Sequence, residues 1–313
     1  MLEPLRLDGL GSHLEDRYGV EVRALTPLDL GVYRVDRRDG VPWVARVFAA
    51  QRPLAGVQDD ARILQALERA AFPAERCADP EPVSEFLGQG VLVTGFLEDH
   101  GQLRAGRSAA ILGALLGRLN THPATNLRAG GAWHHLCFAG GPREEIAAAA
   151  ELLDDHLPHV GVRELAAFDR LRDEVARTDD CHDLPHAFVH PDFVLANAIS
   201  TADERLAIVD WTGAGRGPRL WSIGFLLWAA GARDLRLVNA VVSRYRRSVD
   251  LEPSELDRLD GAIRGRPVML EAWSVCVGRS DVAGAVDRIE RAGQLAAQIA
   301  AEARRAFATP LDG

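Results

Sequence analysis

The chain has 313 residues, a formal net charge of −9 and 47% hydrophobic residues, so it is long enough for two lobes with separate cores or for one large domain. The acidic balance argues against nucleic acid as the main partner, because such a partner requires a basic face. No apolar run approaches the ~20 residues needed to span a bilayer, and the N-terminus lacks the pattern of a signal peptide. We therefore expect a cytoplasmic protein with no membrane partner.

The sequence contains no lysine, so all 36 basic residues are arginines. This excludes a P-loop with its lysine, a Schiff-base lysine and a lysine nucleophile. A GC-rich coding bias explains the missing lysines more simply than selection for arginine chemistry does. In either case, any group that clamps phosphate here must be arginine. The four cysteines are widely dispersed without CxxC pairing, and we expect them to be reduced core thiols.

The first ~95 residues are predicted to be rich in strands, with amphipathic or buried patterns broken by glycine, proline and Asp-Gly. The expected elements are, in order, a helix over 10–18, strands over 20–26, 32–35 and 41–48, a helix over 58–71, and a strand over 90–96. The composition then changes, and the remainder is mostly helical apart from one hairpin. The pattern predicts an α+β protein with a β-rich N-terminal lobe over 1–97 and a helical C-terminal lobe over 98–313.

One charged residue interrupts the predicted strand over 41–48. Arg46 shares a face with Val44 and Phe48, which is costly unless an anion such as phosphate lies there. Asp60, in the first turn of the next helix, has two open interpretations: a pair with Arg46, or stabilisation of the helix N-terminus. The segment 28–33, with its single glycine, is a candidate loop over the phosphates.

The most informative segment runs from His190 to Asp210. Asp192 is followed by Asn197 five positions later, and by Asp210 thirteen positions beyond that. Residues 197–200 and 206–210 are predicted to form a hairpin with Ser200 opposite Leu206, which would bring Asn197 and Asp210 to one end, roughly 5 Å apart. Two such oxygen ligands suit Mg²⁺, and Asp192 could accept a hydrogen bond from a substrate hydroxyl.

The histidines of this region have a competing interpretation. His182, His186, His190 and Asp192 fall within eleven positions, which leaves a metal-dependent hydrolase open as an alternative. Pro185 and Pro191 argue against the helix that would align the histidines. For His190 itself we expect a buried side chain that braces the loop through hydrogen bonds, rather than a proton shuttle.

With these residues in view, the chain resembles the aminoglycoside phosphotransferase and choline kinase-like family, which has the bilobal protein kinase-like fold. The resemblance rests on Val44-Ala45-Arg46-Val47, the loop 190–197, Val209-Asp210-Trp211 and the Gly217-Pro218 turn. It implies ATP or GTP as phosphate donor. It implies that Arg46 lies at the phosphates with Asp60 as its partner. It also implies that Asp192 is the catalytic base, with His190 in the catalytic loop, and that Asn197 and Asp210 hold Mg²⁺. The nucleotide base would meet backbone groups of Thr94, Gly95, Phe96 and Leu97.

The chain also departs from the family pattern. Pro191 replaces the usual glycine, Ser222 stands where relatives have an aspartate that braces the catalytic loop, and Asn120 replaces a common histidine. Proline fixes φ and removes a backbone donor. These departures leave open a catalytically inactive nucleotide-binding regulator, although all three residues proposed for chemistry are retained.

The acceptor is expected to be a small hydroxylated molecule bound against the helical lobe. The family resemblance favours an antibiotic of aminoglycoside, nucleoside or macrolide type, with resistance by O-phosphorylation. Such a protein would act as a monomer or homodimer. The candidate acceptor-binding residues are Asp154, Asp155, Glu271 and Trp273.

Overall fold

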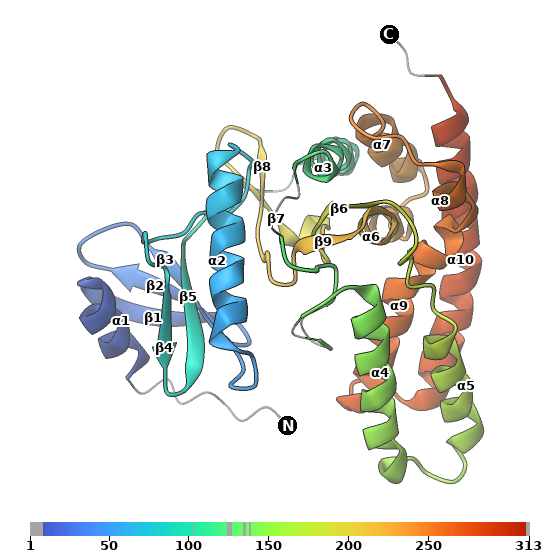
Figure 1. Ribbon diagram of the computed structural model, residues 1–313, viewed down its shortest axis with the longest axis horizontal. Helices are drawn as coiled ribbons and strands as arrows, with labels where there is room; N and C mark the ends of the chain where they lie inside the picture. The colour runs from blue at the N-terminus through green and yellow to red at the C-terminus, as the bar shows by residue number, and fades with distance from the viewer. Residues whose placement is uncertain (1–8, 102, 124–126, 134–135, 138, 311–313) are drawn as a thin grey trace. The chain divides into compact units, whose positions relative to one another are not determined.

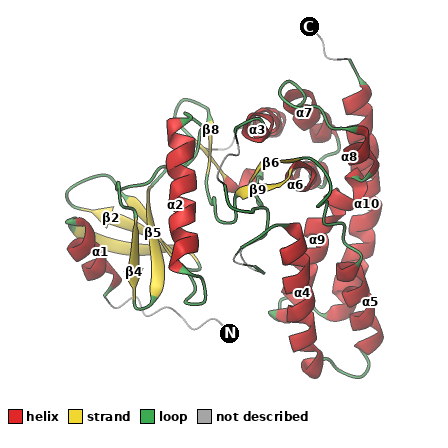
Figure 2. Ribbon diagram, viewed as in Figure 1, coloured by secondary structure: helices red, strands yellow, loops and turns green. Residues whose placement is uncertain are grey.

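Two units, each with its own core, make up the chain. The computed structural model describes residues 9–101, 103–123, 127–133, 136–137 and 139–310. Unit 1 comprises residues 1–101 and 198–211, and unit 2 comprises residues 102–197 and 212–313. Strands dominate unit 1 and helices dominate unit 2 (Figure 2). This is the α+β organisation that the sequence predicts.

Unit 1 is built on an antiparallel sheet with strand order β1-β2-β3-β5-β4 (Figure 1). Four of these strands lie within a few residues of their predicted positions. The fourth in sequence, β4, is missing from the prediction because it is short and carries Ser84 and Glu85, which break the apolar pattern. The strands are β1 (Val22–Asp29), β2 (Val32–Arg37), β3 (Trp43–Val47), β4 (Val83–Phe86) and β5 (Gln89–Gly95).

Two helices accompany this sheet. Helix α1 (Leu10–Tyr18) has the predicted bounds, and its Leu10 and Leu14 share a core with buried sheet residues. Helix α2 (Leu54–Arg69) begins earlier than predicted, directly after Pro53 with φ −60°, because proline is well tolerated at a helix start. A Cβ built on Gly90 would lie 2.8 Å from Val57 Cγ2, so glycine there permits the close approach of α2 and β5.

A hairpin far along the chain also belongs to unit 1. Strands β7 (Ala198–Ser200) and β8 (Leu206–Ile208) pair with Ser200 opposite Leu206, which is the predicted register. Ile208 donates its N–H to Pro73 O at 2.9 Å and forms a parallel bridge with Ala74. The structure therefore differs from the predicted division at residue 97, because backbone bonds attach 198–211 to unit 1.

The regular structure in the described residues of unit 2 is helical apart from a two-stranded sheet, β6 (His186–Val189) with β9 (Gly215–Pro218), that the sequence did not predict. Buried residues of α4, α5, α9 and α10 form one core, which includes Leu153, Phe168, Met269 and Ile289. The helices are α3 (Ala105–Asn120), α4 (Pro142–His156), η1 (Leu157–His159), α5 (Leu165–Ala176), η2 (Leu195–Asn197), α6 (Arg219–Gly231), α7 (Arg236–Tyr245), α8 (Pro253–Asp257), α9 (Leu259–Cys276) and α10 (Val282–Ala308).

Helices α3 and α7 of unit 2 approach each other closely at a glycine. A Cβ at Gly113 would lie 2.2 Å from the carbonyl oxygen of Val241, so only glycine fits there. Among the helices that the structure describes, none combines the length and apolarity needed to cross a membrane. All four cysteines are free thiols, and Cys181 is buried.

Candidate functional site

An ion pair joins the two candidate residues of unit 1. Arg46, on β3, places Nη1 2.8 Å from Oδ1 of Asp210, which follows β8. Their side chains are 20% and 21% exposed, so solvent still reaches both. The position of Arg46 among apolar residues predicts a nearby anion such as phosphate. In this structure that anion is the carboxylate of Asp210.

Glu75 organises this pair. One oxygen, Oε1, accepts the backbone N–H of Asp210 at 2.7 Å, and the other accepts the hydroxyl of Thr94 at 3.0 Å. Burial raises the pKa of Glu75, with repulsion from Asp210 adding to the rise and attraction to Arg46 opposing it. Burial works against the charge of Arg46, but the nearby carboxylates, Asp210 foremost, outweigh it and raise the pKa of that guanidinium. No sequence pattern singled out Glu75.

Asp210 has an unusual backbone conformation. Its φ of +62° lies in the left-handed region, which aspartate tolerates better than most residues but which costs of order 1–3 kcal/mol. The strand β8 ends at Ile208, so Asp210 lies two residues beyond it and does not close it as predicted. The bond to Glu75 holds this conformation, and such strain is concentrated at functional sites.

Asp60 is bound mainly to another arginine. Its Oδ2 accepts a hydrogen bond from Arg52 Nη2 at 2.5 Å, with both side chains 2% exposed. Asp60 also attracts the charge of Arg46. Since Asp60 lies in the second turn of α2, which begins at Leu54, the predicted role at the helix N-terminus is wrong. Asp60 thus forms a buried pair with Arg52 and adds an electrostatic attraction to Arg46.

The segment predicted to meet the nucleotide base ends β5. The Thr94 side chain is 4% exposed and its hydroxyl binds Glu75. The N–H of Gly95 donates to Arg76 O at 2.9 Å, and that of Phe96 donates to Pro42 O at 3.0 Å. Any base recognition in this segment would therefore use its remaining backbone groups, including those of Leu97.

The candidate loop over the phosphates is a tight turn. Gly31 has φ +71°, which lets β1 run into β2 with only residues 30 and 31 between the strands. Leu28 and Leu30 are 50% and 66% exposed. This segment is thus a hairpin tip with two exposed apolar side chains.

In unit 2, the loop after β6 carries Asp192, and hydrogen bonds of His190 and Ser222 stabilise it. His190 is fully buried, and its Nδ1 accepts the backbone N–H of Asp192 at 3.0 Å. The Ser222 hydroxyl, on α6, donates to the carbonyl of His190 at 2.9 Å. These bonds show His190 bracing the loop, as expected, and Ser222 holding the backbone of the same loop.

Asn197 closes the same loop. It ends the short helix η2 rather than starting β7, so its predicted place in a strand is wrong. Its Nδ2 donates to the carbonyl of Asp192 at 3.0 Å, which fixes the orientation of the amide group. The Asp192 carboxylate is 19% exposed. The loop thus presents one carboxylate and one oriented amide.

The sequence analysis missed two residues of unit 2 near this loop: Arg266, which contacts it, and Glu145, which binds Arg266. Arg266, on α9, donates through Nη2 to the carbonyl of Pro191 at 3.1 Å and through Nη1 to Glu145 at 2.5 Å. Burial raises the pKa of Glu145 to about 7, against the opposing attraction of Arg266. A signal was present, because Arg266 stands directly before the apolar run Pro267-Val268-Met269-Leu270 of α9.

The predicted acceptor-binding residues lie on two helices. Asp154, on α4, pairs with Arg172 at 2.5 Å, and Asp155 beside it is exposed. Glu271, on α9, binds Arg288 through both oxygens at 2.8 and 2.9 Å. Trp273 is half-buried and packs edge-on against Trp133, with ring centroids 5.5 Å apart. Asp154 and Glu271 thus serve helix-to-helix ion pairs here.

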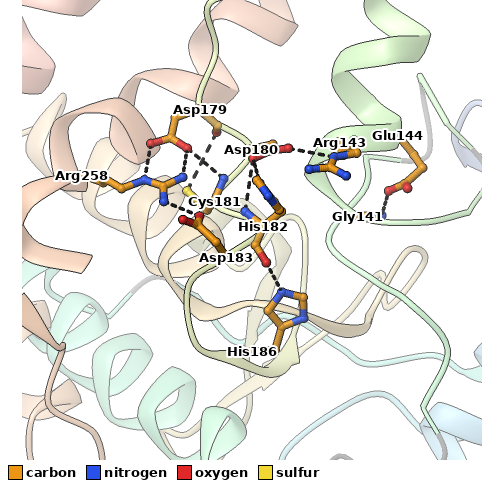
Figure 3. Close-up of polar contacts among 10 residues, drawn as sticks. All are labelled: Gly141, Arg143, Glu144, Asp179, Asp180, Cys181, His182, Asp183, His186 and Arg258. Carbon is orange, nitrogen blue, oxygen red and sulfur yellow. Dashed lines mark hydrogen bonds and ion pairs between the residues drawn. The ribbon is translucent and has the colours of Figure 1, made fainter. Parts of the chain in front are cut away.

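The histidines suspected of binding a metal have other partners (Figure 3). His182 Nδ1 lies 2.7 Å from Asp180, which also pairs with Arg143, and the ring of His186 bonds to the carbonyl of His182 at 3.1 Å. No cluster of three or more histidine, cysteine or acidic side chains suited to a metal occurs among the described residues. In this structure the rings of His182 and His186 are both engaged by neighbouring protein groups.

Comparison with known proteins identifies the class. The family model described as the phosphotransferase enzyme family matches residues 28–259, which is most of the chain, so the protein belongs to that family. The chain is therefore a phosphotransferase by family. No curated protein sequence matches the chain.

Solved structures show the same fold at low identity. Choline kinase LicA from Streptococcus pneumoniae matches with a TM-score of 0.63 and 15% identity, covering 93% of this chain and 98% of that one. An aminoglycoside phosphotransferase from Alicyclobacillus acidocaldarius gives 0.59 and 13%, covering 93% and 94%. The amicoumacin kinase hAmiN gives 0.63 and 14%, covering 96% and 95%. The protein kinase-like fold is thereby confirmed.

Proposed function

We propose that the protein transfers the γ-phosphoryl group of ATP or GTP to a hydroxyl of a small molecule, with Mg²⁺ as the divalent ion. The observation that carries this proposal is the braced loop of unit 2. It holds the backbone of Asp192 through His190 and Asn197 while leaving the carboxylate partly exposed. A positioned, solvent-accessible carboxylate is the group that phosphoryl transfer to an alcohol requires.

Asp192 is the proposed base. A carboxylate can accept a hydrogen bond from the acceptor hydroxyl, orient its oxygen and take its proton late in the transfer. The backbone bonds on either side of it keep the carboxylate in place without a rearrangement. Positioning of this kind supplies most of the acceleration in phosphoryl transfer.

Asn197 and Asp210 are the proposed metal ligands. The residues fit a hard cation, because Asn197 has a fixed amide and Asp210 already faces a positive charge at 2.8 Å. Ala198 pairs with Ile208. Asn197 lies one position before Ala198, and Asp210 lies two positions after Ile208. Mg²⁺ takes one or two protein oxygens, and when bound it would neutralise phosphate charge.

Arg46 is the proposed phosphate-binding cation, since the sequence offers no lysine for this role. It would exchange part of its attraction to Asp210 for the nucleotide phosphates, which arginine binds well. The amicoumacin kinase in the comparison is a complex with AMP-PNP and Ca²⁺. That relative supports a nucleoside triphosphate and a divalent ion as ligands of this chain too. Residues Thr94 to Leu97 are the proposed neighbours of the nucleotide base.

For the acceptor we propose an antibiotic of the aminoglycoside, nucleoside or macrolide type, inactivated by O-phosphorylation. Two of the similar structures are an aminoglycoside phosphotransferase and an amicoumacin kinase. The acceptor-binding set remains Asp154, Asp155, Glu271 and Trp273. Binding by Asp154 or Glu271 would require release of the arginine that each now holds.

The test is a transfer screen with purified protein, Mg²⁺ and either ATP or GTP. The panel contains aminoglycosides, macrolides, nucleoside antibiotics and amino alcohols, and mass spectrometry detects the phosphorylated product. We expect transfer to at least one antibiotic and loss of that transfer in Asp192→Ala. Transfer confined to amino alcohols would contradict the resistance role. Nucleotide binding without any release of γ-phosphate, to acceptors or to water, would favour the inactive regulator.

A further inference from the structure

A buried cation on α9 lies directly beneath the loop that carries Asp192. The Arg266 side chain is 1% exposed, and its guanidinium lies 5.7, 5.8 and 5.3 Å from the ring centres of Trp133, Trp221 and Phe225. Burying a charge is unfavourable unless ion pairs and hydrogen bonds compensate for its lost hydration. The contacts of Arg266 must therefore compensate for the burial of its charge.

The guanidinium makes contacts in two directions. On one side, Nη1 binds Glu145, which is fully buried and also accepts the backbone N–H of Trp133 at 2.7 Å. On the other side, Nη2 donates to the carbonyl of Pro191 at 3.1 Å, and Nε lies 3.9 Å from Oδ1 of Asp192. Glu145 and the aromatic rings thus fix a cation whose remaining donors face the loop.

This arrangement acts on both the backbone and the charge of the loop. The bond to Pro191 holds the peptide group that leads into Asp192. At 3.9 Å in a poorly hydrated setting, the positive charge attracts the Asp192 carboxylate toward α9. Because guanidinium is planar and its donors point in fixed directions, one side chain can serve Glu145 and the loop together.

We propose that Arg266 is a positioning residue for phosphoryl transfer, anchored by Glu145 and holding Pro191 and Asp192 in the geometry that the acceptor hydroxyl needs. This inference rests on the proposed function of Asp192. A purely structural role for Arg266 would predict effects on stability alone. A positioning role predicts a lower kcat with an unchanged KM for the nucleotide, because the nucleotide is not what Arg266 holds.

A matched control lies two residues away on the same helix. Arg264 pairs with Glu174 of α5 in a partly exposed ion pair. The variants Arg266→Met and Arg264→Gln each remove one arginine ion pair from α9, but only the first removes contacts to the loop. Arg266→Lys keeps the charge while losing the planar set of donors.

The experiment measures Mg·ATP or Mg·GTP hydrolysis by the full-length protein, with water as the acceptor and whichever nucleotide the wild type consumes. We expect Arg266→Met to lower kcat by on the order of 10²-fold, the scale for a misplaced reacting group, with the nucleotide KM within about twofold of wild type. Arg266→Lys should recover part of the loss, and Arg264→Gln should match wild type. Equal kcat in Arg266→Met and Arg264→Gln would overturn the proposal.

A second measurement does not depend on activity. Hydrogen exchange of peptides covering residues 188–197 is compared among folded wild type, Arg266→Met and Arg264→Gln. We expect faster exchange in this segment for Arg266→Met only, beyond any change in the α10 peptides that report global opening. Unchanged local exchange would overturn the positioning role. Failure of the wild type to transfer phosphate to water and to every acceptor of the transfer screen would instead contradict the proposed function, and the exchange result would still decide the role of Arg266.

Discussion

Arg46 Nη1 lies 2.8 Å from Asp210 Oδ1, so the cation proposed for phosphate and the carboxylate proposed for metal neutralise each other. When they bind, the nucleotide phosphates should therefore replace Asp210 as the partner of Arg46, and the divalent ion should replace Arg46 as the partner of Asp210. A cation that approaches Asp210 competes with Arg46, whereas phosphate oxygens compete with Asp210. This relationship makes the two binding events interdependent.

The first prediction concerns this competition. Arg46→Gln should weaken binding of ATP by on the order of 10-fold, about 1.4 kcal/mol, because a phosphate partner is lost. The same change should strengthen binding of Mn²⁺ alone, since Asp210 loses its competing cation. Calorimetric titrations with each ligand measure both effects. Arg17→Gln, which removes an exposed pair with Glu81, serves as the control. Weaker binding of both ligands would contradict the competition.

The second prediction separates two roles of Asp60. Asp60→Asn should lower the free energy of unfolding by about 3–5 kcal/mol, because Arg52 is left buried without its ion pair. Asp59→Asn, which breaks a partly exposed pair with Arg62, should cost no more than about 1 kcal/mol. Denaturant melts measure both values. A higher KM for nucleotide in Asp60→Asn without lost stability would show that Asp60 serves the cofactor.

The third prediction concerns the brace on the catalytic loop. Ser222→Ala leaves the buried carbonyl of His190 without this donor, so unfolding should become easier by about 1–3 kcal/mol. Ser243→Ala, which removes a long local bond of 3.4 Å on α7, should change stability by no more than about 0.5 kcal/mol. Thermal and denaturant melts compare the two. Equal effects would mean that Ser222 does not brace the loop.

The fourth prediction is a pH dependence of stability. Burial raises the pKa of Glu145 from 4.5 to about 7, although Arg266 opposes and Asp192 adds to the rise. A raised pKa means that the folded state binds the proton more tightly. Its contribution is therefore full below pH 4.5 and is lost as pH rises through about 7.

This dependence is measured against Glu145→Gln, which cannot titrate. From pH 4.5 to 7, wild type should lose stability relative to the variant by at most about 1.36 kcal/mol per pH unit. Denaturant melts across pH 4–8 provide the curves. Parallel curves for the two proteins would show that Glu145 has an ordinary pKa.

Local sequence signals predicted the elements that local forces determine. Helix α1 has the predicted bounds because Gly19 ends it in a left-handed conformation. The register of β7 and β8 follows from the turn between Ser200 and Leu206. The pairing of β6 with β9 was missed, because each strand has only four residues and β9 contains two glycines and a proline.

The residues of the candidate site also fall into two groups, those that a local sequence pattern identifies and those that only the fold brings close. Asp192, Asn197 and Asp210 were identifiable because their spacing follows a pattern, and His190 because apolar residues and a proline surround it. Glu75 and Arg266 were not, because they act on Asp210 and Pro191 at separations of 135 and 75 residues. Only the folded chain brings such pairs together. A charge beside an apolar run, as at Arg266 before Pro267-Val268-Met269-Leu270, was the one available signal.

The most direct test of the central claim is calorimetric titration of the protein with AMP-PNP, in the presence and absence of Mg²⁺, for wild type and Asp210→Asn. The account predicts that Mg²⁺ tightens nucleotide binding to wild type by at least about 10-fold, and that Asp210→Asn loses this dependence. Tightening by Mg²⁺ that is identical in both proteins, or no nucleotide binding by wild type, would contradict the account.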